Sequence, residues 1–177
     1  MSNVRQGMQK DYFYKMVKSP VGELKLVASN DGLAAILWEN DNPQRVRLNI
    51  VGEDQEHPIL LEAERQLEEY FGGLRRAFDL KLDFAGTEFQ KKVWRALLTV
   101  PFGETRSYVQ IARQIGNPSA VRAVGAANGK NPISVIAPCH RVLGSSGELT
   151  GFAGGLEAKA HLLSLEGTET KPIKKTA

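Results

Sequence analysis

Asn131-Pro132-Ile133-Ser134-Val135-Ile136-Ala137-Pro138-Cys139-His140-Arg141-Val142 is the stretch around which the rest of this chain is organised. An apolar run rich in β-branched residues ends at Pro138, and the chain's single cysteine follows at once. A thiol is nucleophilic only as the thiolate, which needs a base or a positive charge nearby. Because proline lacks a backbone N–H and stiffens the chain, we expect Cys139 to be presented at a fixed bend. The competing interpretation is a small core residue, the usual fate of a free cysteine in a hydrophobic run.

The bulk composition is that of an ordinary globular protein. Its 177 residues are 42% hydrophobic and 24% charged, enough for one large domain or two small ones. A single cysteine excludes an internal disulfide and suits a reducing compartment, and the N-terminal residues lack the apolar segment of a signal peptide. We therefore expect a cytoplasmic protein without membrane spans. The cysteine and the three histidines have no metal-ligand spacing, so neither a metal nor a cofactor is predicted.

The charge is distributed unevenly. Residues 1–84 carry 11 Lys and Arg against 14 Asp and Glu, a net charge of −3, whereas residues 85–177 carry 12 against 6, a net charge of +6. A basic C-terminal half favours a polyanionic partner, and nucleic acid first. The alternative is ordinary surface charge, to which the short basic tail contributes.

The N-terminal half has the pattern of a small antiparallel β-meander followed by a helix. Alternating segments and turn signals predict strands over Tyr12–Val17, Gly22–Ser29 and Leu33–Trp38, with a last strand over Phe78–Phe84. A helical pattern covers Ile59–Phe71 and stops at Gly72-Gly73. His57, just before that helix, is predicted to be an exposed loop residue, and residues 1–11 are predicted to be disordered.

The C-terminal half begins near Ala85-Gly86 and has a helical pattern. Thr87 precedes a helix that ends before Pro101, and Leu156–Leu165 forms a final helix. Between them, two short helices separated by a turn containing Gly116 have the outline of a helix-turn-helix; they are predicted over Tyr108–Ile115, capped by Ser107, and over Ala120–Ala127, capped by Ser119. An ordinary pair of packed helices is the alternative.

Taken together, the motifs resemble those of the 6-O-alkylguanine-DNA alkyltransferases of the bacterial constitutive type. The likeness is strong over residues 87–167 and rests on Pro138-Cys139-His140-Arg141-Val142, Asn131-Pro132, Tyr108, Arg122-Ala123-Val124-Gly125-Ala126, Gly151-Phe152-Ala153-Gly154-Gly155 and Glu166-Gly167. It implies an α+β fold in three parts. These are a ribonuclease H-like domain with a small antiparallel sheet and a helix (1–84), a mainly helical domain with a winged helix-turn-helix (85–170) and a basic tail (171–177).

The resemblance also implies a chemistry. The protein would repair DNA by moving the alkyl group of 6-O-alkylguanine, and of 4-O-methylthymine, irreversibly to Cys139, once per molecule. His140 would act through a water as the base that produces the thiolate, and Glu166 would orient and stabilise that histidine. Tyr108 would give a proton to the leaving guanine ring, and Asn131 would brace the turn beside the thiol.

The implied partner is double-stranded DNA that contains alkylated bases, bound by a monomer with cooperative assembly on DNA left open. The target nucleotide must be flipped out of the stack, and Arg122, from a helix of small residues laid in the minor groove, would fill its place. Phe152 would pack on the base, and the Ala153 N–H would lie near the alkylated oxygen. The other expected contacts are Ala123, Ala126, Ala127, Gly154 and Lys159.

Two other functions are compatible with parts of the pattern. A non-catalytic lesion binder would share the DNA-binding residues, but such relatives replace the cysteine that is present here. A cysteine hydrolase would use Cys139 and His140, but the partners of a hydrolase meet only in the fold and the helix-turn-helix would have no role. Phe152 and Ala153 stand where some relatives have tyrosine and serine, so any side-chain hydroxyl contact there is lost.

Overall fold

The structure, a computed structural model, describes residues 10–173. The predictions of a disordered N-terminus and of a basic tail therefore fall largely outside the described residues. Within residues 10–173, no helix is long and apolar enough to cross a membrane.

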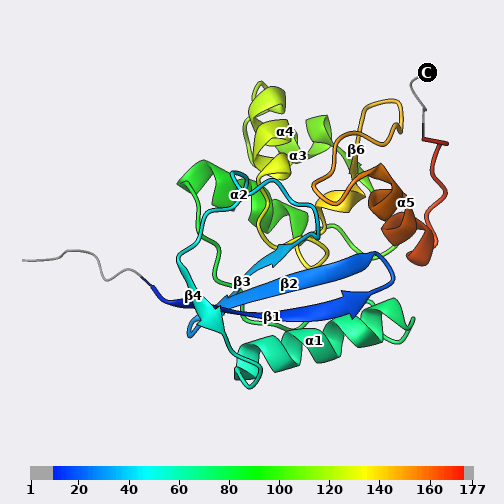
Figure 1. The fold of residues 1–177 in the computed structure, drawn as a ribbon. Coiled ribbons are helices and arrows are strands. Elements are labelled where there is room, and N and C mark those ends of the chain that lie inside the picture. Colours follow the sequence, from blue (N-terminus) through cyan, green and yellow to red (C-terminus); the bar gives the residue numbers. More distant parts are fainter. Residues whose placement is uncertain (1–9, 174–177) are drawn as a thin grey trace, which may run out of the picture.

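A four-stranded sheet forms the N-terminal half (Figure 1). The predicted strands are confirmed as β1 (Tyr12–Ser19), β2 (Gly22–Ser29) and β3 (Gly32–Leu37), which pair antiparallel in sequence order. The prediction of a purely antiparallel sheet is wrong, because β4 (Ile50–Glu53) pairs in parallel with the free edge of β1. Only four residues long and with alternate residues exposed, β4 carries too short a pattern to be found in the sequence.

The predicted strand over Phe78–Phe84 is wrong in extent. Only an isolated bridge joins Leu33 to Leu82. Two hydrogen bonds of 2.8 Å hold it, from the Leu33 N–H to the Lys81 carbonyl and from the Asp83 N–H to the Leu33 carbonyl. The alternating pattern arises because four apolar side chains are partly buried against the core: Phe78, Leu80, Leu82 and Phe84. An extended loop can bury alternate side chains in this way as well as a strand can.

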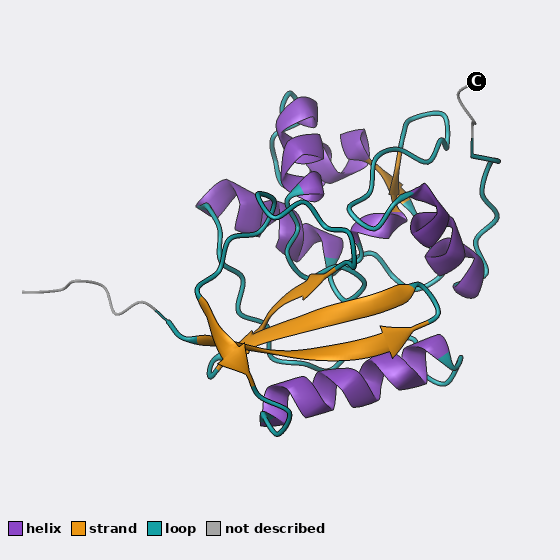
Figure 2. Cartoon of the chain, viewed as in Figure 1, coloured by secondary structure: helices purple, strands orange, loops and turns teal. Residues whose placement is uncertain are grey.

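Helix α1 (Pro58–Phe71) covers one face of this sheet, and the C-terminal elements cover the other (Figures 1 and 2). The prediction of an exposed His57 is wrong: the side chain is 5% exposed. Its Nδ1 accepts the Ile59 N–H at 3.2 Å and so caps the first turn of α1. The ring also lies against Phe13, 6.1 Å between centroids, a contact that only the packing of α1 on the sheet creates.

The C-terminal half contains α2 (Glu88–Leu97), β5 (Arg106–Ser107), α3 (Tyr108–Gln114), α4 (Val121–Gly129), β6 (Val142–Leu143) and α5 (Leu156–Leu165). The predicted cap Ser107 is confirmed, and Thr87, after which a helix is predicted to begin, caps α2. Each forms a reciprocal capping box with the glutamine three residues later. Ser119 is not the cap of α4: Ala120 takes that position without a side-chain bond, and the Ser119 hydroxyl donates to Asn117 Oδ1 at 3.2 Å. The hydroxyl is used within the turn itself.

One apolar core joins the two halves. Leu26, Ile36 and Trp38 of the N-terminal half pack with Ile133 and Leu162 of the C-terminal half in a single buried cluster. A second cluster lies among α2, α3 and α4 and includes Cys139. The segment Ile133–Cys139 therefore sits between the two halves rather than inside one of them.

Candidate active site

The loop Asn131–Pro138 is a chain of tight turns, and Asn131 holds it together. The Asn131 side chain donates from Nδ2 to the Ala137 carbonyl at 2.8 Å and accepts the Ile133 N–H on Oδ1 at 3.1 Å. The residue is fully buried. This is the bracing contact expected of Asn131, made with backbone groups of the buried loop.

Two of these turns span a single residue each. The Ile136 N–H bonds to the Ser134 carbonyl at 2.9 Å across Val135, which has a φ of 74°. This is the rare, strained form of the γ-turn, in a conformation that β-branched residues avoid. The Cys139 N–H bonds to the Ala137 carbonyl at 2.7 Å across Pro138, whose φ of −80° and ψ of 67° are those of an inverse γ-turn. Pro138 thus makes the fixed bend that presents Cys139.

The N-terminal half anchors this loop from outside. The Ile36 N–H of β3 donates to the Pro132 carbonyl at 2.8 Å, and the Trp38 indole N–H donates to the Ser134 hydroxyl at 3.1 Å. Arg45, paired with Asp41, donates from Nη1 to the Asn131 carbonyl at 2.6 Å. Packing against a neighbouring sheet is what allows the strained Val135 to persist.

His140 follows Cys139 in the short 3₁₀ turn Cys139–Arg141 and is paired with Glu166 at the end of α5. His140 Nε2 lies 2.9 Å from Glu166 Oε2, and neither side chain is exposed. The Arg141 guanidinium binds the same carboxylate through Nε at 2.8 Å and Nη2 at 2.9 Å, and donates to the Val100 carbonyl from Nη1. Tyr70 of α1 adds a fourth hydrogen bond, from its hydroxyl to Oε2 at 2.6 Å.

These contacts fix the charge states. Burial by itself raises the pKa of Glu166, but the hydrogen bonds from His140 and Arg141 outweigh it and lower that pKa to about 2. Burial lowers the pKa of His140, with Glu166 opposing the shift. An ionised Glu166 accepts a hydrogen bond from the Nε2–H group, which leaves Nδ1 of the neutral ring as an acceptor. That Nδ1 is buried and has no hydrogen-bond partner among residues 10–173.

Cys139 is 4% exposed, and burial raises the pKa of its thiol. The Asn131 side chain and the charge of Lys159 act in the opposite direction. Lys159 is itself fully buried on α5, with Nζ donating to the carbonyls of Val142 at 2.9 Å and Thr150 at 3.2 Å, and burial lowers its pKa to about 8. Thiol and imidazole are therefore both neutral at rest, and the thiolate has to be made when it is needed.

Tyr108 stands at the start of α3, directly after the Ser107 cap. Its hydroxyl lies 2.6 Å from the Thr150 hydroxyl, and its ring packs against the cluster that contains Cys139. Strand β5 pairs in parallel with β6, which follows the Cys139–Arg141 turn, so the backbone itself ties Tyr108 to that turn.

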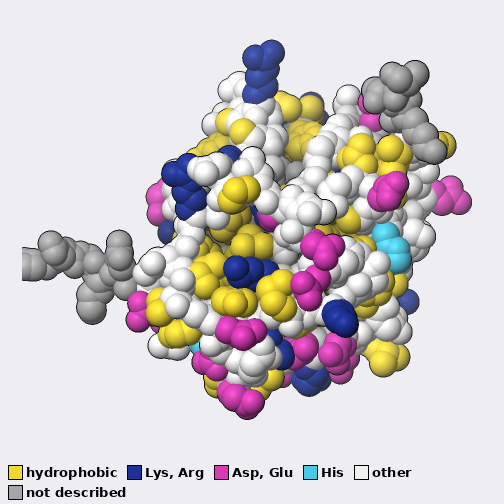
Figure 3. Space-filling view, viewed as in Figure 1, with side chains coloured by type: hydrophobic (Ala, Val, Ile, Leu, Met, Phe, Trp, Pro, Cys, Tyr) yellow, Lys and Arg dark blue, Asp and Glu magenta, His cyan; other side chains and the backbone are white. Residues whose placement is uncertain are grey.

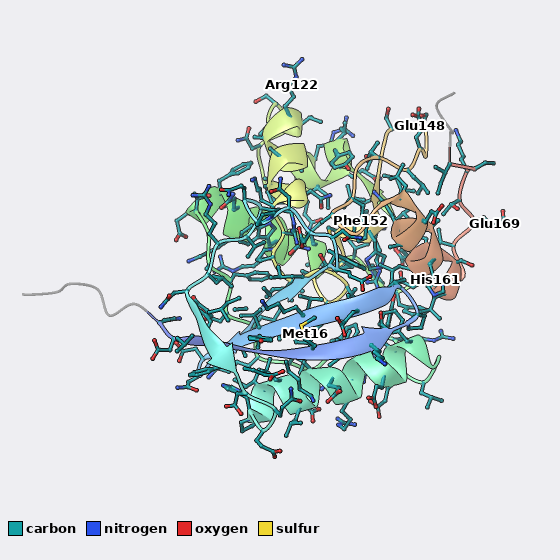
Figure 4. All side chains as sticks on the ribbon, in the orientation of Figure 1. Met16, Arg122, Glu148, Phe152, His161 and Glu169 are labelled. Carbon is teal, nitrogen blue, oxygen red and sulfur yellow. The ribbon has the colours of Figure 1, made fainter. Side chains whose placement is uncertain are left out.

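The glycine-rich loop 151–155 packs on the N-terminal half through Trp38. The Trp38 and Phe152 rings meet edge to face with centroids 5.3 Å apart. A side chain at Gly154 would place its Cβ 2.5–2.7 Å from three indole atoms, so only glycine fits there. Figure 4 shows Phe152 near the middle of the molecule, between α4 and α5. Phe152, Ala153 and Gly154 are all half-buried.

Helix α4 carries Arg122 to the edge of the molecule. Arg122 is exposed and points away from the body of the protein at the tip of α4 (Figure 4). A basic side chain projects at the same place in Figure 3, whereas acidic and basic side chains are mixed lower on that face. Ala123 and Ala126 are also exposed. Ala127 does not fit the predicted contact set: it is 3% exposed and packs in the core, where its carbonyl accepts the Trp94 indole N–H at 2.8 Å.

Sequence reasoning missed Tyr70, Trp38 and Arg45. All three come from the N-terminal half, between 86 and 96 residues away in sequence from the groups they bind. No local sequence pattern distinguishes them from ordinary residues of their elements. Tyr70, for example, has the helical spacing of a core residue. The place of Arg141 beside His140 in the sequence is the one local signal of its contact with Glu166.

The arrangement can extract a proton from a buried thiol without building up isolated charge. Neutral His140 could accept the proton and Glu166 could compensate the imidazolium, since Arg141 keeps Glu166 ionised. This is the logic of a nucleophile, base and orienting acid, applied to a cysteine.

Comparison with known proteins agrees with this geometry. Residues 12–84 match the family model for the 6-O-methylguanine DNA methyltransferase, ribonuclease-like domain, and residues 88–168 match that for its DNA binding domain. A curated relative from Methanosarcina acetivorans, a methylated-DNA–protein-cysteine methyltransferase, is 47% identical over 88% of this chain and 99% of its own. The crystal structure of Mycobacterium tuberculosis O6-methylguanine methyltransferase matches with a TM-score of 0.77 and 47% identity over 88% of this chain and 92% of that one. A crystal structure of M. tuberculosis OGT in complex with DNA matches with a TM-score of 0.77 and 46% identity over the same shares of the two chains. The chain belongs to the 6-O-methylguanine DNA methyltransferase family.

Proposed function

We propose that this protein repairs DNA by transferring the alkyl group of 6-O-alkylguanine, and of 4-O-methylthymine, to the sulfur of Cys139. The observation that carries the proposal is the buried Cys139–His140 pair, with His140 Nε2 held by Glu166 and Nδ1 left as the acceptor. A new S–C bond forms as the O–C bond to the base breaks. Because a thioether has no route back to the thiol here, each molecule acts once.

The proton comes off the thiol through His140. Nδ1 takes it by way of a bridging water, and the imidazolium is stabilised by Glu166, which already has a low pKa. The negative charge that develops on the departing guanine ring is neutralised by a proton from the Tyr108 hydroxyl. Thr150, 2.6 Å away, can then return a hydrogen bond to the Tyr108 oxygen.

The DNA side of the proposal rests on α4. Its exposed face carries Ala123 and Ala126, whose small side chains would allow the helix to approach a groove closely, and Arg122 lies at its tip. The flipped base would enter beside Phe152, with the Ala153 N–H near the alkylated oxygen. We further propose that the protein acts as a cytoplasmic monomer; sedimentation with and without DNA tests both the monomer and any cooperative assembly.

Intact-mass spectrometry tests the proposal directly. The protein is incubated with a duplex oligonucleotide containing 6-O-methylguanine, and the product is mapped by peptide. We expect one methyl group per protein, on Cys139, with no turnover beyond one equivalent. Tight binding to the modified duplex without any adduct would instead assign a lesion binder, the alternative that the DNA-binding face alone would support.

Arg122→Ala is expected to slow methyl transfer from duplex DNA about 10-fold while leaving transfer from the free base unchanged. Without the arginine, the gap in the stack is unfilled and part of the cost of flipping, a few kcal/mol, is no longer offset. Single-turnover rates on duplex and on free 6-O-methylguanine measure the difference. Lys130→Ala, which removes an exposed cation from the other end of α4, is the matched control. Equal losses on both substrates would contradict the flipping role.

Gly154→Ala is expected to destabilise the protein by about 1–3 kcal/mol and to slow transfer, because the new methyl group overlaps the buried Trp38 indole. Chemical denaturation and single-turnover kinetics measure the two effects. Gly151→Ala is the control in the same loop, since its Cβ would meet nothing within 4 Å. If the two variants behave alike, the contact of Gly154 with Trp38 does not set the loop's position.

A further inference from the structure

The carboxylate of Glu166 receives one hydrogen bond from outside the catalytic half of the chain. The Tyr70 hydroxyl of α1 lies 2.6 Å from Oε2, and the two residues are 96 positions apart in sequence. Tyr70 is 1% exposed and Glu166 4% exposed, so water does not compete for the bond. Oε2 is also the oxygen that faces His140 Nε2, at 2.9 Å.

The tyrosine ring is held rigidly enough to aim this bond. Its centroid lies 5.2 Å from that of Phe71, 5.3 Å from that of Phe78 and 6.3 Å from that of Phe102. The Arg141 guanidinium lies over the Phe102 ring, 5.9 Å from its centroid. The hydroxyl is the only polar atom of this aromatic cluster, and it points at the catalytic carboxylate.

The direction of the bond is fixed by charge. Burial raises the pKa of Tyr70, so the phenol keeps its proton, whereas Glu166 is ionised. The hydroxyl therefore donates and the carboxylate accepts. A donor on Oε2 withdraws electron density from the atom that stabilises the His140 imidazolium, and so reduces the pull of Glu166 on the imidazole proton.

We propose that Tyr70 is a positioning residue for the His140–Glu166 pair, by which the N-terminal half sets the basicity of the catalytic histidine. The proposal rests on the function proposed above, in which neutral His140 accepts the thiol proton. It also gives the N-terminal half a task beyond support of the loop. The charged and titratable groups around His140 are Cys139 and Arg141 on its own turn, Lys159 and Glu166 from α5, and Tyr70, through Glu166, from α1.

Tyr70→Phe removes only the hydroxyl and predicts a shift with a definite sign. With one donor fewer, Oε2 is more negative and stabilises the protonated imidazole more strongly, so the pKa of His140 rises. The proton-accepting form is then lost at a higher pH on acidification. We expect the acid limb of the single-turnover rate to move up by about half to one pH unit, with DNA affinity unchanged.

Tyr12→Phe is the matched control, since Tyr12 is buried in the same half of the chain but belongs to a separate cluster with Val27 and Ala35. If Tyr70 had only a structural role, Tyr70→Phe would lower the midpoint of thermal unfolding and leave the pH profile of the transfer rate unchanged. A Tyr70→Phe profile that superimposes on that of the wild type therefore overturns the proposal, whatever its stability.

A measurement on the wild-type protein covers the case in which Tyr70→Phe does not fold or no methyl transfer is found. With tyrosine labelled at the ζ carbon and histidine labelled at the ring nitrogens, NMR follows both groups through a pH titration. We expect the Tyr70 ζ-carbon shift to change with the midpoint of His140. A Tyr70 ζ-carbon shift that does not change at the His140 midpoint overturns the proposed coupling. The absence of a Cys139 adduct in the wild type overturns the proposed function alone.

Discussion

Cys139→Ser is expected to abolish methyl transfer completely while leaving DNA affinity within about twofold of the wild type. A serine hydroxyl has a far higher pKa than a thiol, so His140 cannot generate the alkoxide, and the uncharged hydroxyl is a poor nucleophile toward an alkyl carbon. The substitution is small and buried, and it lies away from the exposed face of α4 that carries Arg122.

Intact mass and fluorescence anisotropy on a labelled duplex measure the two properties of this variant. The wild type, run in parallel, should gain one methyl group and the variant none. A methylated Cys139→Ser protein would place the acceptor at another residue, which peptide mapping would identify. Loss of DNA affinity together with transfer would show that the variant is misfolded rather than chemically inactive.

Glu166→Gln is expected to cost about 3–5 kcal/mol of stability at neutral pH and to slow transfer by at least about 10²-fold. The buried Arg141 guanidinium loses its counter-charge, and a neutral amide has one oxygen for the four hydrogen bonds that the carboxylate accepts from Tyr70, His140 and Arg141. The remaining amide nitrogen is a donor that must face another donor. His140 loses the group that compensates its charge.

The pH dependence of that stability has a definite sign. The pKa of Glu166 is lowered from 4.5 to about 2 in the folded protein, so its contribution is present in full above 4.5 and is lost as the pH falls toward 2. The stability difference between wild type and Glu166→Gln should therefore shrink in this window, as measured by urea unfolding. Glu157→Gln, an exposed change on the same helix, should cost less than about 1 kcal/mol. A Glu166→Gln protein within 1 kcal/mol of the wild type at neutral pH would contradict the buried ion pair.

Local signals predicted the local structure well. Ser107 caps its helix as predicted because a cap and its glutamine partner lie within one turn of each other. Where the deciding contact was distant, prediction failed. His57 looked like a loop residue and is a buried cap. Strand β4 is defined by its pairing with the edge of β1, which lies more than 30 residues earlier in the chain.

The candidate site divides along the same line. Asn131, Pro138, Cys139 and His140 lie within ten residues, and their turns close through bonds inside that segment. The sequence by itself therefore determined the bend and placed the proposed nucleophile next to its proposed base. The tertiary structure alone decided the rest. It buried Glu166 between His140 and Arg141, turned Ala127 inward, and brought Trp38 onto the loop Asn131–Pro138 and Tyr70 onto Glu166. The physical reason is that burial and charge compensation depend on groups far apart in the chain, which approach each other only when the shared core forms.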